Sequence, residues 1–326
     1  MRINYSQRLI YAVYMKDQLV IGTRRSVLAL WQSSFIREAL QAAFPGLRIE
    51  LKYIITTGDK TQDSNASIPS IGGKGLFTAE LEEALVQQEI DLAVHSLKDL
   101  PTTMAAEFVL GAITARGQVA DVLISSSGKR LSELPAGAVI GTSSLRRSSQ
   151  ILRMRPDLAP LLIRGNVDTR INKVQAHGGK YDAIVLAHAG IARLGLESQI
   201  TQVFTDEEML PAPGQGALTV ECRANDSELL QMLTKLHDPL TAAAVTAERA
   251  FLSELGAGCN TPVAAHAVIE TRGVAQYVVF KGRCLSHDGG NVVEVMGEAL
   301  LGSETQLGER MAHEVMARGF KRLCAA

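Results

Sequence analysis

Cysteine is scarce, with four residues in a chain of 326. The four lie far apart and form no C-x-x-C pair, and none has a histidine or cysteine at zinc-ligand spacing. This pattern excludes a disulfide scaffold, predicts no metal site and is typical of reduced thiols, so we expect a cytoplasmic protein. The four residues are Cys222, Cys259, Cys284 and Cys324.

An excess of charge of either sign is also missing. Lysine and arginine number 33 and aspartate and glutamate 34, for a formal net charge of −1, and aromatic residues make up only 5%. Proteins that bind nucleic acid through phosphate neutralisation carry more positive charge, and single strands need aromatic platforms. We therefore expect no nucleic-acid partner, and any anion site has to come from local clustering of cations.

Long hydrophobic runs are absent too, because none approaches the roughly 18 to 20 residues that cross a bilayer. We therefore expect no membrane partner. Residues 1–18 are interpreted as an N-terminal extension, since the apolar patch at 9–15 contains tyrosines and no small-residue cleavage site follows it. Met15 is an alternative start. A chain of 326 residues exceeds what one core usually organises, which favours two or three domains.

Strand-like and helix-like segments alternate through the first two thirds of the chain, as in parallel sheets covered by helices. The segment 57–75 is rich in Gly, Ser and Asp and is expected to be a long mobile loop. The other expected elements are strands at 19–23, 48–56 and 91–95 and helices at 26–43 and 76–88.

A second copy of this arrangement is expected to begin near residue 138. IGTSS at 140–144 resembles IGTRRS at 21–26, and DAIV at 182–185 resembles DLAV at 91–94. Such short echoes also arise by chance in α/β proteins, so both interpretations stay open. Duplication predicts two similar lobes that face a cleft.

From about residue 239 the pattern changes. A helix at 242–255 precedes strand-like runs near 263–269, 275–284 and 292–300, and a helix at 304–318 ends the segment. Consecutive strands predict a small antiparallel sheet and hence an α+β third domain. The sequence GAGCN, which contains Cys259, lies at its entrance.

Arginine is concentrated in one stretch, where only Asp157 and Asp168 oppose it. Such a cluster binds carboxylate or phosphate, or it forms surface ion pairs on a solvated helix. The position favours anion binding, because a helix start is expected directly after a strand. The arginines are Arg146, Arg147, Arg153, Arg155, Arg164 and Arg170, and the helix start is Thr142, Ser143 and Ser144.

Three further segments have two interpretations each. Residues 71–75, IGGKG, lack the complete phosphate-loop order and are either a hinge or a ligand contact. Asp99 follows an expected buried strand and is either a catalytic acid or a turn former before Pro101. Cys259 lies in a polar, glycine-containing loop and is either a nucleophile or a small buried residue.

Seven motifs in order resemble the porphobilinogen deaminase family. They cover the chain from about residue 19 to its end. The motifs are IGTRRSVLALWQ at 21–32, GGKGLF at 72–77, HSLKDLP at 95–101, GTSSLRR at 141–147, RGNVDTR at 164–170, PGQGA at 213–217 and GC at 258–259.

The resemblance implies an α/β fold with two periplasmic-binding-protein-like lobes around a cleft and a small α+β C-terminal domain with a three-stranded antiparallel sheet. Residues 19–115 with 215–235 would form lobe 1, 116–214 lobe 2 and 236–326 the domain of the cofactor cysteine. It implies a monomeric hydroxymethylbilane synthase of haem biosynthesis. Such an enzyme polymerises four porphobilinogen molecules, with loss of ammonia, on a dipyrromethane joined by a thioether to Cys259.

By the same resemblance, Asp99 stabilises the cationic intermediate and assists proton transfer, while cations hold the carboxylates of the growing oligopyrrole. A two-lobed polycarboxylate-binding protein is the alternative, although pure binding requires neither Asp99 nor Cys259. The segment 115–121, ARGQVAD, departs from the charged run of the family and retains Arg116 and Asp121. The contacts implied are Arg24, Ser26, Lys74, Lys98, Thr142, Ser143, Ser144, Arg146, Arg147, Arg164, Gly165, Arg170, Arg193 and Gln215.

Overall fold

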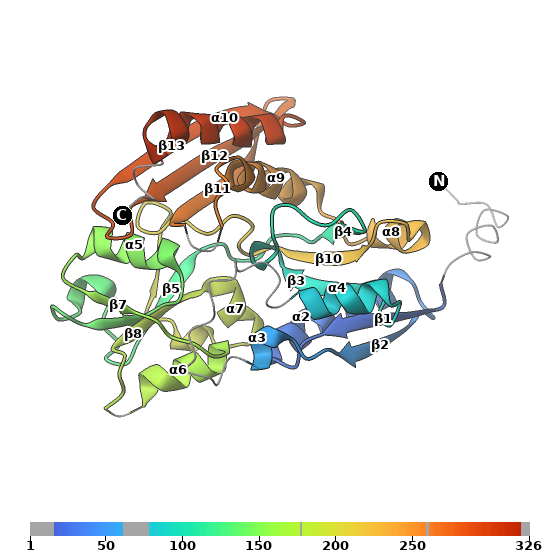
Figure 1. The fold of residues 1–326 in the computed structure, drawn as a ribbon, viewed down its shortest axis with the longest axis horizontal. Coiled ribbons are helices and arrows are strands. Elements are labelled where there is room, and N and C mark those ends of the chain that lie inside the picture. Colours follow the sequence, from blue (N-terminus) through green and yellow to red (C-terminus); the bar gives the residue numbers. More distant parts are fainter. Residues whose placement is uncertain (1–15, 61–77, 177, 259–260, 321–326) are drawn as a thin grey trace.

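The computed structural model describes residues 16–60, 78–176, 178–258 and 261–320. In this part of the chain the strands form two five-stranded sheets and one three-stranded sheet (Figure 1). Helices pack on both faces of each five-stranded sheet. The expected α/β architecture, with two lobes and a small C-terminal α+β unit, is confirmed.

The first lobe is a mixed sheet. Its strands lie in the order β2 (Arg48–Tyr53), β1 (Gln18–Thr23), β3 (Leu92–Ser96), β10 (Leu218–Arg223) and β4 (Phe108–Ile113). The first three are parallel, and β10 is antiparallel to both of its neighbours. Helices α2 (Val27–Ala43) and α8 (Ser227–Leu233) pack on one face and α4 (Ala79–Val86) on the other.

The second lobe repeats this pattern. Its strands lie in the order β7 (Ala159–Leu161), β6 (Val139–Gly141), β8 (Ala183–Ala187), β5 (Asp121–Ser125) and β9 (Gln202–Val203). The first three are parallel, and β5 is antiparallel to both neighbours. Helix α5 (Leu145–Met154) covers one face, and α6 (Val167–Gln175) and α7 (His188–Arg193) cover the other.

The expectation of parallel sheets is wrong for one strand in each lobe, because β10 and β5 are antiparallel to their neighbours. Both β5 and β10 follow a segment that has crossed from the other lobe, so they enter their sheets at the edge where the parallel strands end. The register shows this directly, since Leu218 pairs with Ser96 and Asp121 pairs with Ala187. The shared pattern of strand directions supports the expectation of two similar lobes.

The C-terminal unit is an antiparallel meander, as expected. Strands β11 (Val263–Arg272), β12 (Ala275–Leu285) and β13 (Val292–Leu300) pair in chain order. Helices α9 (Pro239–Glu254) and α10 (Glu304–Ala317) share a core with this sheet, centred on Phe251 and Phe280. None of the helices in the described ranges is long and apolar enough to cross a membrane.

Two crossover segments, 114–120 and 204–217, run side by side between the lobes. The backbone N–H of Gly117 donates to the carbonyl of Gly216 at 3.1 Å. Gly216 has a φ of +91°, and a Cβ there would lie 2.8 Å from the carbonyl oxygen of Gly117. Glycine is therefore required at this crossing.

The crossover segments are also joined to the C-terminal unit. Arg116 donates to both carboxylate oxygens of the buried Glu248 on α9, at 2.7 and 3.0 Å. Glu248 also accepts the backbone N–H groups of Gly214 and Ala267, at 2.7 and 2.8 Å. One buried carboxylate therefore connects both crossovers to the third sheet.

The segment expected to be one long loop begins differently. Residues Thr57–Lys60 form a short helix, α3, where the Asp59 carboxylate accepts from the hydroxyl of Thr56 at 2.8 Å. This local bond stabilises the turn and explains the helical start. The rest of the expected loop, 61–75, lies outside the described residues.

Candidate active site

Asp99 lies just beyond the carboxyl end of β3, in a short 3-10 helix, η1 (Leu97–Asp99). Leu97 is fully buried, and its backbone N–H donates to the carbonyl of Ala217 at 3.0 Å. Asp99 itself is exposed, and its carboxylate makes no hydrogen bond to any residue in the described ranges. This end of a parallel strand is where open α/β sheets bind ligands, so the carboxylate is accessible to one.

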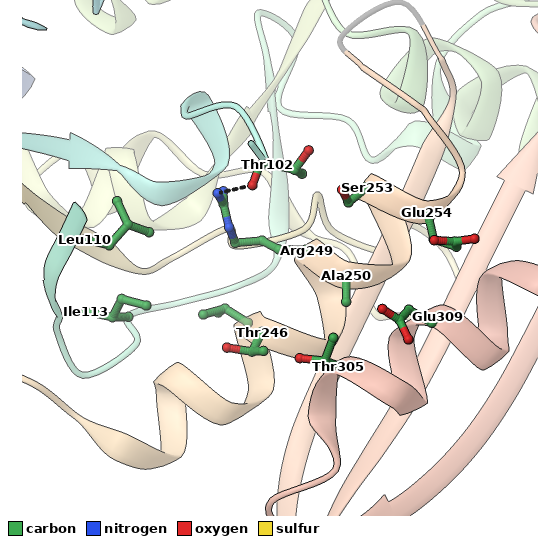
Figure 2. Close-up of a pocket in the computed structure, with 11 residues that line it drawn as sticks. Thr102, Leu110, Ile113, Thr246, Arg249, Ala250, Ser253, Glu254, Thr305 and Glu309 are labelled. Atoms are coloured by element: carbon green, nitrogen blue, oxygen red, sulfur yellow. Dashed lines mark hydrogen bonds between the residues drawn. The ribbon is translucent and has the colours of Figure 1, made fainter. Parts of the chain in front are cut away.

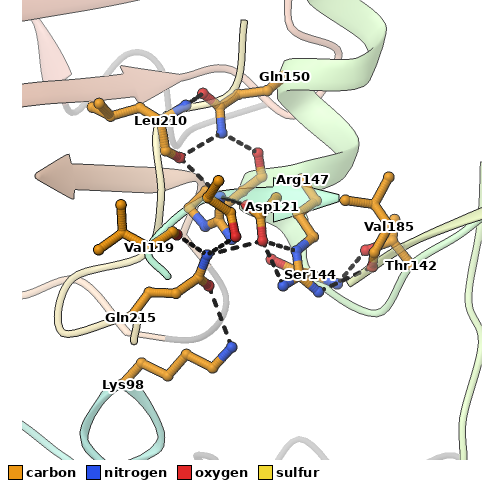
Figure 3. A network of polar contacts seen from close by, with 12 residues as sticks. Lys98, Val119, Asp121, Thr142, Ser144, Arg147, Gln150, Val185, Leu210 and Gln215 are labelled. Carbon is orange, nitrogen blue, oxygen red and sulfur yellow. Dashed lines mark hydrogen bonds and ion pairs between the residues drawn. The ribbon is translucent and has the colours of Figure 1, made fainter. Parts of the chain in front are cut away.

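A buried carboxylate in the second lobe organises two of the expected arginines. Asp121, the first residue of β5, is fully buried. Arg146 donates to Oδ2 of Asp121 at 2.7 Å, and Arg147 donates to Oδ1 through Nε at 3.1 Å and Nη2 at 2.8 Å. Figure 3 shows Arg147 and Asp121 at the centre of this network. The excess positive charge of the arginine-rich stretch is thus partly neutralised by Asp121.

The charge of Asp121 is stabilised by its partners. Burial alone would raise the pKa of the Asp121 carboxyl, but Arg146 and Arg147 lower it well below its usual range. Arg147 also donates to the carbonyl of Val185 at 3.1 Å, and Arg146 to that of Leu210 at 2.8 Å. Both guanidinium groups are therefore fixed in orientation.

Gln215 joins this network to the first lobe. Its side-chain nitrogen donates to Oδ1 of Asp121 at 3.0 Å and to the carbonyl of Val119 at 2.6 Å, and its side-chain oxygen accepts from Nζ of Lys98 at 3.3 Å (Figure 3). Gln215 is fully buried. Because the Gln215 side chain has no exposed surface, its influence on a ligand passes through Lys98 and Asp121.

Lys98 and Arg170 are cations whose charge is partly destabilised. Burial and the nearby Arg147 lower the pKa of Lys98 to about 8, although Asp99 and Asp121 oppose this shift. Burial and Arg147 lower the pKa of Arg170 to about 10, and Asp99 opposes that shift. Arg170 of the second lobe and Asp99 of the first lobe are therefore close enough to influence each other electrostatically.

The loop before α6 is shaped around Arg170. Its Nε donates to the carbonyl of Gly165 at 2.7 Å. Gly165 has a φ of +111°, and a Cβ there would lie 2.8 Å from Cγ2 of Thr169. Arg164 is half-buried, and its carbonyl accepts from Lys173 at 3.0 Å. Gly165 is therefore needed for the turn that orients Arg170.

The two expected helix starts differ in detail. Ser26 caps α2 by accepting the backbone N–H of Ala29 at 3.3 Å, and Arg24 pairs with Asp59 of α3. At the start of α5, the Thr142 hydroxyl accepts the backbone N–H of Ser144 at 3.2 Å. Ser143 is exposed, and the side chain of Ser144 makes no cap hydrogen bond.

Arg193 contacts a different set of groups. Its Nη2 donates to the carbonyl of Gly216 at 2.7 Å, and its guanidinium lies over the ring of Trp31 at 5.7 Å. Burial lowers the pKa of Arg193 to about 10. It lines a cavity of about 500 Å³ beside the crossover 114–120, together with Trp31 and Phe35.

Two predicted site residues, Lys74 and Cys259, lie outside the described residues. Of the other cysteines, Cys222 and Cys284 are buried in strands, as the sequence pattern predicted. Burial raises the pKa of the Cys222 thiol to about 12. A thiol in that state is a poor nucleophile, so the structure offers no rival to Cys259 among these two.

Sequence reasoning missed the roles of Asp121 and Glu248. Asp121 was noted only as a retained residue of the crossover, and Glu248 was not singled out. For Asp121 a signal was available, because it is a single acidic residue at the start of a buried strand in a chain that also has an arginine-rich helix start. Both carboxylates are fully buried, and such groups require charged or hydrogen-bonding partners.

The fold and the site together define a class of protein. Two α/β lobes are joined by the crossovers 114–120 and 204–217. Four cations, Lys98, Arg146, Arg147 and Arg170, lie where the lobes meet, and among the described residues Asp99 and Asp121 are the carboxylates that oppose their charge. This excess of positive charge is suited to a ligand with several carboxylates. The class is that of two-lobed α/β proteins with a polyanion site and an accessible carboxylate beside it.

Comparison with known proteins identifies the family. Residues 19–231 match the model described as "Porphobilinogen deaminase, dipyromethane cofactor binding domain", and residues 242–317 match "Porphobilinogen deaminase, C-terminal domain". The chain belongs to the porphobilinogen deaminase family.

Curated relatives match over nearly the whole chain. The porphobilinogen deaminase of Roseiflexus castenholzii is 45% identical over 311 residues, which cover 95% of this chain and 100% of the relative. That of Halalkalibacterium halodurans is 44% identical over 308 residues, with 94% and 96% covered. Among solved structures, the methionine-binding protein MetQ is similar with a TM-score of 0.41 and 12% identity, over 68% of this chain and 88% of that one.

Proposed function

We propose that the cationic cluster of Lys98, Arg146, Arg147 and Arg170 holds the carboxylates of the oligopyrrole while Asp99 assists each condensation. The family reaction is that of a transferase, hydroxymethylbilane synthase, which joins four porphobilinogen molecules and releases ammonia in tetrapyrrole biosynthesis. The observation that carries the residue assignment is the accessible Asp99 carboxylate beside an excess of buried or half-buried cations.

The residues present fit the dipyrromethane cofactor of the family. Each pyrrole unit carries an acetate and a propionate, so two joined units present four carboxylates. Arg147 is fixed by Asp121 and Val185, so its guanidinium is preorganised and little side-chain entropy is lost on binding. Lys98 and Arg170 would meet the remaining carboxylates, and Arg24, Arg164, Arg193, Ser26 and the 142–144 helix start would extend the site.

Asp99 is suited to two steps of the reaction. Loss of ammonia from porphobilinogen leaves a cationic methylene-pyrrolenine, and a carboxylate within reach of its pyrrole N–H stabilises that charge. After the new carbon–carbon bond forms, a proton leaves the attacked α-carbon, and Asp99 can accept it directly or through water. The cofactor, held on the Cys259 thiol, supplies the free pyrrole α-position at which the chain grows.

The organisation of the chain supports further proposals. We propose that residues 19–115 with 215–235 form lobe 1, that 116–214 form lobe 2 and that 236–326 form the domain of the cofactor cysteine. We also propose a cytoplasmic protein without a nucleic-acid partner, on the basis of the scattered cysteines and the net charge of −1. The monomeric state is proposed from the resemblance to the family.

The pKa of Lys98 predicts a pH dependence of substrate binding. We expect KM to rise as the pH increases through about 8, because the neutral amine no longer attracts a carboxylate. Lys98→Met should have a higher KM at neutral pH and should lack this inflection. Steady-state kinetics of both proteins across that pH range checks this, and an inflection that persists in the variant would assign it to another group.

Intact-mass spectrometry with peptide mapping tests the proposed function. We expect purified protein to carry the mass of one dipyrromethane on the peptide that contains Cys259 and to form heavier adducts when porphobilinogen is added. Cys259→Ser should carry none, and Cys222→Ser is the control that should keep the adduct. An unmodified Cys259 that acquires nothing from porphobilinogen would favour the alternative, a binding protein without catalysis.

A further inference from the structure

The segment that follows Asp99 is held by an arginine of the C-terminal unit. Arg249 on α9 donates through Nη2 to the carbonyl of Pro101 at 2.6 Å. Weaker contacts of 3.4 Å join Nη1 to the carbonyl of Leu100 and Nη2 to that of Thr102. Figure 2 shows the Arg249 side chain extending from α9 toward Thr102. One guanidinium therefore spans three consecutive carbonyl groups.

The position of Asp99 depends on its backbone. Its carboxylate has no hydrogen-bond partner in the described ranges, so no side-chain contact fixes it. On the upstream side, the buried Leu97 is tied to Ala217 by its backbone N–H. On the downstream side, Arg249 provides the corresponding anchor at Leu100 and Pro101. Asp99 is the residue between these two anchors.

Arg249 has no other evident use for its charge. No carboxylate in the described ranges forms an ion pair with it, and burial lowers the pKa of its guanidinium. A desolvated arginine without an ionic partner is unfavourable unless its donors are used. The planar fork presents donors on separate nitrogens to adjacent carbonyls, whereas an ammonium group presents its three donors from a single nitrogen.

The neighbouring residue connects the same helix to the crossovers. Glu248 binds Arg116 and the backbone of Gly214, whereas Arg249 binds the segment after Asp99. Helix α9 ends at Glu254, five residues before Cys259 in the sequence. Glu248 and Arg249 thus attach the crossovers and the segment after Asp99, respectively, to the helix that precedes Cys259 in the sequence.

We propose that Arg249 is a positioning residue for the reaction, which holds the carbonyls of Leu100, Pro101 and Thr102 and thereby fixes the place of Asp99. The proposal rests on the catalytic role of Asp99 proposed above. A displacement of about 1 Å in a catalytic group lowers a rate by up to about 100-fold. The effect belongs to kcat, because Arg249 does not contact the cationic cluster.

Arg249→Ala with chemical rescue is the central test. We expect kcat, per molecule that carries the cofactor by intact mass, to fall about 10- to 100-fold while KM changes less than about twofold. The removed side chain borders a cavity of about 300 Å³, which gives a guanidinium ion room to enter. Millimolar guanidinium chloride should restore part of the lost kcat, whereas sodium chloride at equal ionic strength should not. Absence of rescue in a folded variant would overturn the proposal.

Arg155→Ala is a matched control. Arg155 also donates to three carbonyls of a neighbouring segment, those of Leu131, Ser132 and Leu134, but it lies in the second lobe, where it pairs with Asp157. We expect this variant to be less stable yet to keep kcat and to show no response to guanidinium. An equal loss of kcat in Arg155→Ala would reduce the Arg249 effect to general destabilisation and count against the proposal.

Two further measurements keep the proposal falsifiable. Arg249→Lys retains the charge and should fold, but with one donor centre it should have an intermediate kcat; a wild-type kcat would overturn the need for the fork. Hydrogen–deuterium exchange over residues 97–104 should accelerate in Arg249→Ala, and unchanged exchange there would also contradict the proposal. Asp99→Asn separates the two hypotheses. If Asp99→Asn retains turnover, the proposed catalytic role of Asp99 is wrong. If Asp99→Asn loses turnover but Arg249→Ala retains it, Asp99 keeps its role and only the positioning role of Arg249 is wrong.

Discussion

Asp99→Asn is expected to lower turnover by about 10²- to 10⁴-fold while leaving the fold and the attached cofactor in place. Asparagine keeps the size of the side chain but carries no charge, so it stabilises neither the cationic methylene-pyrrolenine nor a departing proton. Because Asp99 is exposed and makes no hydrogen bond in the described ranges, the substitution breaks no contact that stabilises the protein. Stability should therefore be unchanged.

Three measurements on the same preparation check this result. Hydroxymethylbilane formation gives kcat, thermal unfolding gives stability, and intact mass gives the fraction of protein that carries the cofactor. Asp168→Asn is a suitable control, since Asp168 is another exposed carboxylate, in the first turn of α6 beside the arginine loop. It should retain turnover. If Asp99→Asn retains turnover as well, Asp99 has no part in the mechanism.

Local signals in the sequence predicted most elements of the fold. Strand β3 and the polar residues at its end were expected because a buried-type strand led directly into a charged segment, and the structure has β3 at Leu92–Ser96. The start of α9 was placed three residues late. Asp238 accepts the backbone N–H of Thr241 at 2.7 Å and Pro239 occupies the first turn, so a standard helix-start signal was present.

The strand directions could not be derived in the same way. A strand that follows a crossover and starts beside the carboxyl end of its neighbour runs opposite to that neighbour, but its hydrophobic pattern is the same in either direction. For β5 the buried run is Val122, Leu123 and Ile124, which fits a parallel or an antiparallel strand equally well. The direction of β5 in its sheet is decided only by the crossing of the chain from one lobe to the other.

The site shows the same limit of local reasoning. The arginines at 146 and 147 were predicted as anion ligands from their density, and the chemistry of the guanidinium supports this. Their internal counter-ion, however, lies 25 and 26 residues earlier in the chain. That pairing depends on β5 and the start of α5 meeting in the folded lobe. The role of these arginines as anion ligands stays a prediction, and the structure shows that Asp121 neutralises part of their charge.

Asp121→Asn is expected to destabilise the protein strongly. The carboxylate is fully buried and is the ionic partner of both Arg146 and Arg147. An asparagine can accept from one arginine through its oxygen, but its amide nitrogen then faces the donor of the other. Removal of one partner from a buried ion pair typically lowers the free energy of unfolding by about 3–5 kcal/mol. Chemical denaturation at neutral pH measures this difference.

The pH dependence gives a second, independent result. Because the folded pKa of Asp121 is lowered, its contribution to stability is present above the unfolded value, near 3.8, and is lost only as the pH falls toward the folded value. The difference in unfolding free energy between wild type and Asp121→Asn should therefore stay constant from neutral pH to about 4 and shrink at lower pH. A difference that already vanished at pH 5–6 would contradict the ionised buried pair.

A double-mutant cycle separates the ion pair from general packing. Arg146→Met should be destabilising in the wild type, because it leaves Asp121 with one cation, but much less so in Asp121→Asn, where the buried guanidinium is itself unfavourable. Asp157→Asn is the control: Asp157 is exposed and pairs with Arg155, so its loss should change stability little. Additive effects of Arg146→Met and Asp121→Asn would show that the two groups do not stabilise one another. In that case the orientation of Arg146 toward a ligand could not be attributed to Asp121.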